Sequence, residues 1–144
     1  MAKLTIITWI LGVISMSAQA TNHQIEVLVN GVDTSRPGKI LVMLFAEAGF
    51  PKAHDKALQI NRYDSDRSEF SVVFDNAPTQ FAIKVLHDED EDGKVSKNWT
   101  GLIPKEGLGF SNGAKITFKA PSFSSARLDA VDTPFPHEIT ILYP

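Results

Sequence analysis

The sequence contains no cysteine among its 144 residues. Thiol catalysis and disulfide stabilisation are therefore excluded, and the stability of the fold has to come from packing. For an exported protein, this absence suits the bacterial periplasm or exterior better than a eukaryotic secretory route. Basic charge is also limited, with 14 lysines and arginines against 17 acids. We therefore expect no nucleic-acid partner, because such a partner requires a basic stripe.

The chain also lacks an apolar run long enough to span a bilayer as a permanent helix, which takes about 20 residues. Its N-terminus instead has the features of a secretory signal: Lys3, an apolar run over 4–14, and small residues at Ala18 and Ala20. We expect cleavage after Ala20 and export to the periplasm or the exterior of a bacterium, without a permanent membrane anchor. Residues 1–20 are then the signal peptide, and residues 21–144 form one domain.

Short apolar runs separated by Gly, Pro, Asn and Asp are typical of antiparallel β-structure. We predict an all-β fold, a single antiparallel two-sheet β-sandwich of immunoglobulin-like or transthyretin-like type with about seven strands. The run 40–45 is apolar throughout and predicts a strand buried on both faces, whereas 25–30 and 81–87 alternate as half-buried strands. Pro51 predicts a short helical segment over 51–57, and 124–128 is compatible with another helical turn. The remaining predicted strands are 58–63, 69–74, 115–119 and 137–143.

A long connection over 88–113 contains five glycines and little periodicity. Structureless loops of this length are uncommon inside compact domains and are usually functional. At its start, Asp88, Asp90 and Asp92 alternate ahead of Gly93, which is the spacing of calcium loops: oxygens from positions 1, 3 and 5, a bend at 6 and a backbone carbonyl at 7. Lys94 occupies that seventh position, and Ser96 could coordinate through a water.

The match ends at the twelfth position, where Trp99 replaces the usual bidentate glutamate. Glu106 could fill the gap if the loop folds back. The predicted metal ligands are therefore Asp88, Asp90, Asp92, Lys94 and Glu106, and the predicted cofactor is calcium. A solvated acidic turn without an ion is the competing interpretation, although adjacent like charges repel and a cation would relieve that repulsion.

Other candidate sites carry weaker signals. His87 follows the apolar face of 81–85 and adjoins Asp88, so it is a candidate base for hydrolysis, or a histidine that caps the core. The sequence contains no nucleophile elbow, zinc-protease pair, phosphate loop or dinucleotide fingerprint. Apolar residues of the long loop could line a small pocket or pin the loop to the sandwich: Trp99, Leu102, Ile103, Leu108 and Phe110.

Several segments together resemble the family catalogued as domain of unknown function 2141. The acidic run 87–94 is followed by 103–107, which reads Ile-Pro-Lys-Glu-Gly, and by 109–112, which reads Gly-Phe-Ser-Asn. The resemblance extends to most of the chain outside the signal, through Gly38, the run 40–45, Phe50, the segment 121–126 and the final strand 139–143.

The resemblance implies an exported bacterial β-sandwich of about this size, and it implies no established activity. The sequence departs from the family pattern at Ser96-Lys97, where an aspartate is usual, and at Leu108 and Gly113. The first departure removes a possible oxygen ligand and weakens the calcium hypothesis.

We therefore expect a non-catalytic exported module, with calcium in the loop 88–96. The alternatives are a binder of a small apolar ligand or lipid under the Gly-rich loop 99–113, and a hydrolase that uses His87 with a nearby carboxylate. A partner, if there is one, is a small apolar molecule or another exported protein.

Overall fold

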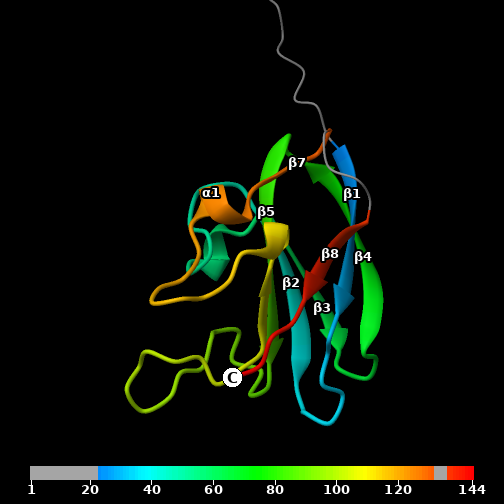
Figure 1. Cartoon of the computed structure of the whole chain (residues 1–144). Helices are drawn as coiled ribbons and strands as arrows, with labels where there is room; N and C mark the ends of the chain where they lie inside the picture. Colours follow the sequence, from blue (N-terminus) through cyan, green and yellow to red (C-terminus); the bar gives the residue numbers. More distant parts are fainter. Residues whose placement is uncertain (1–22, 132–135) are drawn as a thin grey trace, which may run out of the picture.

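Two β-sheets pack face to face in this computed structural model, which describes residues 23–131 and 136–144 (Figure 1). The all-β sandwich predicted from the sequence is confirmed, with eight strands in the described ranges. The expected signal peptide 1–20 lies outside the described residues.

The smaller sheet has the strand order β4-β1-β8 and the larger one the order β3-β2-β5-β6, with β7 paired to one end of β5. The strands are β1 (His23–Asn30), β2 (Lys39–Phe45), β3 (Gln59–Asp64), β4 (Glu69–Ala77), β5 (Gln80–Asp88), β6 (Leu108–Phe110), β7 (Leu128–Asp129) and β8 (His137–Thr140). Most pairings are antiparallel, but β1 and β8 run parallel, with Val29 opposite Ile139.

The main core lies between the two sheets. Strand β1 contributes its alternate residues Ile25, Val27 and Val29, which are fully buried, as the alternation predicts. Strand β2 is buried on both faces over 40–45, also as predicted. Its outward-facing residues join Leu86, Leu108 and Phe110 in a second apolar cluster on the outer face of the larger sheet.

Strand β5 differs from its prediction because it too is buried on both faces, where one exposed face was expected. It lies between β2 and β6 in the centre of the sheet, and the segment that includes Phe50 covers the second apolar cluster. Consequently Lys84, which the alternation placed on a polar face, is only 3% exposed.

The predicted strand 115–119 is wrong. The segment pairs with no other strand in the described part of the chain, and Phe118 is fully exposed. The edge strand of the larger sheet beside β5 is instead β6, which pairs with β5 through Leu86 and Leu108. It lies inside the connection that was predicted to be structureless. Alternation alone does not produce a strand when no neighbouring backbone satisfies its hydrogen bonds.

The helical segments are short. The predicted turn over 51–57 is the 3₁₀ turn η1 (His54–Lys56), and the one over 124–128 is α1 (Phe123–Ala126), whose N-cap Ser122 accepts from the Ser125 amide. A second 3₁₀ turn, η2 (Ser111–Gly113), follows β6. None of the helices in the described ranges has the length and apolar character to cross a membrane.

Candidate metal centre

The acidic loop begins at the end of β5, where Asp88 is paired in register with Lys39 of β2. Asp88 is buried, with only 2% of its surface exposed to solvent. The turn before β2 contacts the start of the loop so closely that a Cβ added to Gly38 would lie 2.1 Å from the Asp88 carbonyl oxygen. Gly38 has a φ of +99°, which together with this contact explains why glycine occupies the position.

Backbone amides of the loop hold the Asp88 carboxylate. Oδ1 accepts from the Asp92 amide at 3.2 Å, and Oδ2 accepts from the Gly93 amide at 2.8 Å. Glu91 and Gly93 both have positive φ, so the chain bends sharply here, as the glycine predicted. The bend turns the loop back over its first aspartate.

Glu106 arrives from the far end of the long connection and is 3% exposed. Its position follows from the sheet, because the His87 amide donates to the Gly107 carbonyl just before β6 pairs with β5. The two carboxylate oxygens of Glu106 accept from the amides of Glu89 at 2.9 Å and Ser96 at 2.8 Å. Glu106 therefore joins both sides of the acidic loop.

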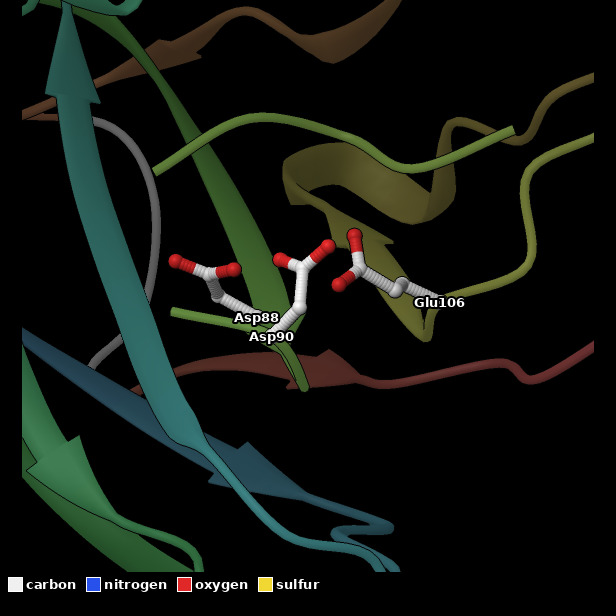
Figure 2. A group of neighbouring side chains, drawn as sticks. All are labelled: Asp88, Asp90 and Glu106. Atoms are coloured by element: carbon white, nitrogen blue, oxygen red, sulfur yellow. The ribbon is translucent and has the colours of Figure 1, made fainter. Parts of the chain in front are cut away.

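Three of the five predicted ligands lie together: Asp88, Asp90 and Glu106 each offer a carboxylate oxygen, and these oxygens lie within 4.8 Å of one another. Figure 2 shows Asp90 between the other two, with its carboxylate turned toward Glu106. Asp92 and Lys94 are not part of this group. The Asp92 side chain instead accepts from the Lys94 amide at 2.7 Å.

The three carboxyl groups have different environments. Burial raises the pKa of Asp88 and of Glu106, and donated amide hydrogen bonds oppose the shift at each of them. A hydrogen bond from the Ser96 hydroxyl, at 2.9 Å, lowers the pKa of exposed Asp90. In the described ranges, no lysine or arginine forms an ion pair with these three residues; the nearest pair in the sequence joins Arg36 to Glu89. Among the residues that the structure describes, no ion pair therefore offsets the negative charge of this cluster.

Carboxylate oxygens are the ligands that calcium prefers, and the ion takes six to eight of them at about 2.3–2.6 Å. The three carboxylates fit such an ion, but they cannot complete its shell alone, so water would supply the remaining positions. Trp99, at the position of the usual glutamate, is 96% exposed and contributes nothing to the cluster.

His87 is fully buried and faces other partners. Its Nε2 lies 2.9 Å from the Pro37 carbonyl and its Nδ1 lies 2.6 Å from the Tyr143 hydroxyl. Since a carbonyl only accepts, Nε2 carries a proton, and in the neutral ring Nδ1 then accepts from the Tyr143 hydroxyl. Both ring nitrogens are therefore occupied, which leaves neither available to act as a base in hydrolysis.

Sequence reasoning missed a second polar cluster beside the loop. The Lys84 ammonium donates to the Pro51 carbonyl at 2.9 Å and contacts His54 Nε2 at 2.7 Å, while His54 Nδ1 donates to the Gly93 carbonyl at 2.8 Å. Burial lowers the pKa of Lys84 to about 8. Burial and the neighbouring Lys84 lower the pKa of His54. No spacing in the sequence links these residues; only the apolar neighbours of Lys84 hint at its burial.

Two surface hollows lie beside the long connection 88–113. One, of about 600 Å³, lies between the acidic loop and β3 and is lined by residues that include Asp92, Arg62 and Tyr63. The other, of about 590 Å³, runs beside β6. Of the five residues expected to line an apolar pocket, Ile103, Leu108 and Phe110 line this second groove, and Trp99 and Leu102 do not.

Comparison with known proteins identifies one family. The family described as uncharacterized protein conserved in bacteria (DUF2141) matches residues 27–135. No curated protein and no solved structure matches the chain.

Proposed function

The chain belongs to the family of bacterial proteins described as DUF2141, a description that names no activity, and from this premise we propose that it is an exported, non-catalytic module that binds calcium in its acidic loop. The ligands are Asp88, Asp90 and Glu106. Other oxygens of the coordination shell come from water. The ion joins the start of the long connection to its end.

One observation carries this proposal: three carboxylate oxygens, two from the start of the acidic loop and one from Glu106 near the far end of the long connection, lie within 4.8 Å of one another. Two of these groups, on Asp88 and Glu106, are buried, and burial penalises their charged forms. A divalent cation would offset both the mutual repulsion and this burial cost. With three protein ligands we expect a weak site, with a Kd of about 10⁻⁴ to 10⁻³ M, the range of extracellular calcium modules.

The competing explanation is that hydrogen bonds alone hold the loop, since the carboxylates of all three residues accept internal donors. A thermal melt distinguishes the two. With a site in the millimolar range, the melting temperature should rise steadily as calcium increases through millimolar concentrations, and a chelator should reverse the rise. Identical midpoints in calcium and in chelator would leave only a hydrogen-bonded turn.

Export is supported by the signal features of residues 1–20. Expression in a bacterial host should give a periplasmic or secreted protein whose mass corresponds to a chain that begins at Thr21. Recovery of the full-length mass from the cytoplasm alone would contradict it.

A second candidate, the binding of a small apolar ligand, is favoured by the groove beside β6. Its lining combines Ile103, Leu108, Phe110 and Leu142, and the last of these is half-exposed. Native mass spectrometry of gently purified protein would reveal a retained ligand as added mass, and a consistently empty protein would count against this candidate.

A further inference from the structure

Large apolar side chains stand exposed at two loops on the same side of the sandwich. The first loop carries Trp99, which is 96% exposed, and Leu102, which is 80% exposed; the second carries Phe118, which is fully exposed. In Figure 1 both loops project from the larger sheet, on the side away from β1 and β4. Ile103 of the first loop and Ile116 of the second line the same groove, so the loops are neighbours in space.

The first loop is a small hairpin held by its own hydrogen bonds. Residues Lys97 and Pro104 form an isolated bridge, and the Asn98 amide donates to the Ile103 carbonyl at 2.8 Å. The Asn98 side chain accepts from the Thr100 hydroxyl at 2.6 Å. Trp99 and Leu102 therefore occupy the end of a small hairpin. Exposure of such side chains to water is unfavourable, and clustered exposure marks an interaction surface.

The charge around these tips is opposite to that of the whole protein. Segment 94–119 contains five lysines and one acid, whereas the chain has a net charge of −3. The single acid, Glu106, is buried in the metal centre. The five lysines are exposed, and none of their ammonium groups forms a hydrogen bond or an ion pair with a described residue: Lys94, Lys97, Lys105, Lys115 and Lys119.

We propose that these two loops form a docking surface for an anionic lipid bilayer. Trp99, Leu102 and Phe118 insert at the level of the lipid headgroups, and the five lysines contact the phosphates. Apolar side chains combined with lysines are the composition that places a segment in the membrane interface. A ligand in the groove beside β6 would not explain these tips, because Trp99, Leu102 and Phe118 are not part of its lining.

The test uses vesicles made of phosphatidylcholine alone or of equal parts phosphatidylcholine and phosphatidylglycerol. It is done in chelator, so that it stands apart from the calcium proposal. The protein used is the processed chain expected after signal cleavage, which begins at Thr21 and contains Trp99 as its only tryptophan. We expect co-sedimentation with the anionic vesicles alone, a blue shift of the Trp99 emission on binding, and loss of binding as salt is raised. The absence of co-sedimentation or of the emission shift would overturn the proposal.

Variants locate the surface. Lys97→Glu with Lys119→Glu should weaken binding by at least about twenty-five-fold, because each lysine near an anionic surface contributes about fivefold. Arg62→Glu with Arg67→Glu is the matched control: it changes the net charge equally but lies at β3 and the connection that follows it, at the opposite edge of the larger sheet. We expect this control to bind nearly as the parent does. Equal losses in the two variants would mean that only the net charge matters, which would overturn the proposed surface.

The apolar contribution is tested with Leu102→Ala and Phe118→Ala together, which should reduce binding at least about tenfold while Trp99 remains as the reporter. Val73→Ala, at a half-exposed position on β4 of the smaller sheet, is its control. All of these positions are exposed, so thermal melts should be unchanged. If sedimentation instead shows concentration-dependent self-association that Leu102→Ala and Phe118→Ala abolish, the loops contact a second copy of the chain and the lipid proposal fails.

Discussion

The Tyr143 hydroxyl lies 2.6 Å from His87 Nδ1 and joins the C-terminal segment to the end of β5. The same hydroxyl accepts from the Asp33 amide at 2.9 Å, and His87 Nε2 donates to the Pro37 carbonyl. This chain of hydrogen bonds connects the turn between β1 and β2 to β5 and to the C-terminal segment. The histidine that could have been a catalytic base is thus a structural link.

Replacement of Tyr143 by Phe tests that link. The change leaves the buried Nδ1 of His87 without its donor, and we expect the free energy of unfolding to fall by about 1–3 kcal/mol. Tyr63→Phe is the control, because no hydrogen bond is formed by the Tyr63 hydroxyl within the described structure, and it should change stability by less than about 0.5 kcal/mol. Urea denaturation measures both, and equal effects would show that the bond to His87 contributes nothing.

The candidate metal centre gives a prediction that distinguishes the carboxylate group found in the structure from the alternate ligands expected from the sequence spacing. Asp90→Asn removes a ligand charge from the group of three, and we expect calcium affinity to fall at least about tenfold, because affinity depends on ligand charge. Asp92→Asn removes the same charge from the same loop but outside the group, and the side-chain amide oxygen that it introduces can still accept from the Lys94 amide.

Calorimetric titration with calcium at pH 7 compares the two variants. A shift of less than about threefold is expected for Asp92→Asn, as for a nearby charge that does not contact the ion. If Asp92→Asn causes the larger loss, the ligands follow the alternate spacing of the sequence and Asp92 must replace Glu106 in the site.

Lys84 gives the clearest dependence of stability on pH. Its pKa is about 8 in the folded protein, below the value of about 10.4 expected in an unfolded chain. Between pH 8 and about pH 10.4, Lys84 binds more protons in the unfolded state than in the folded state, so the free energy of unfolding rises with pH. The contribution is fully present above the unfolded pKa and is lost as the pH falls through about 8.

We therefore expect the free energy of unfolding to increase by about 2 kcal/mol between pH 8 and pH 10. Lys84→Met keeps a long side chain at the site without the ammonium, and this variant should lack the increase. Urea denaturation across this pH range provides the comparison, and a parallel rise in the variant would mean that a different group is responsible.

Much of the fold could be predicted from the sequence, because the first five strands each carry a complete apolar pattern within a few residues. The wrong predictions concern which strands pair with each other. Residues 115–119 alternate well but meet no neighbouring strand in the described structure, while β6 has only three residues and forms because Leu108 can pair with Leu86. Pairing is a property of distant segments, and a local pattern does not report it.

The same difference between local patterns and distant contacts applies to the candidate site. Local spacing predicts the bend at Gly93 and the position of the Asp88 carboxylate under it, because the hydrogen bonds from the Asp92 and Gly93 amides to Asp88 span five residues or fewer. Glu106 joins them only because β6 returns beside β5, which spacing within the acidic loop could not establish. Lys84 and His54 lie 30 positions apart in the chain, and no local pattern relates them.

Two glycines of the site should respond very differently to the addition of a methyl group. Gly93 has a φ of +74°, but nothing lies within 4 Å of an added Cβ, so Gly93→Ala should cost only the backbone penalty of about 1–2 kcal/mol. At Gly38 the φ is +99°, and the added Cβ would lie 2.1 Å from the Asp88 carbonyl oxygen and 2.6 Å from Glu89 Cα.

These contacts are with backbone, so Gly38→Ala can be accommodated only if the turn before β2 moves away from the end of β5. We expect a loss of about 3 kcal/mol or more in the free energy of unfolding, from strain added to the backbone penalty. Because the displaced segment begins at Asp88, calcium affinity should fall in Gly38→Ala and persist in Gly93→Ala, whose amide still donates to the Asp88 carboxylate. Urea denaturation and calcium titration of the two variants measure this. Equal losses of stability would show that the turn before β2 yields easily and does not fix the position of Asp88.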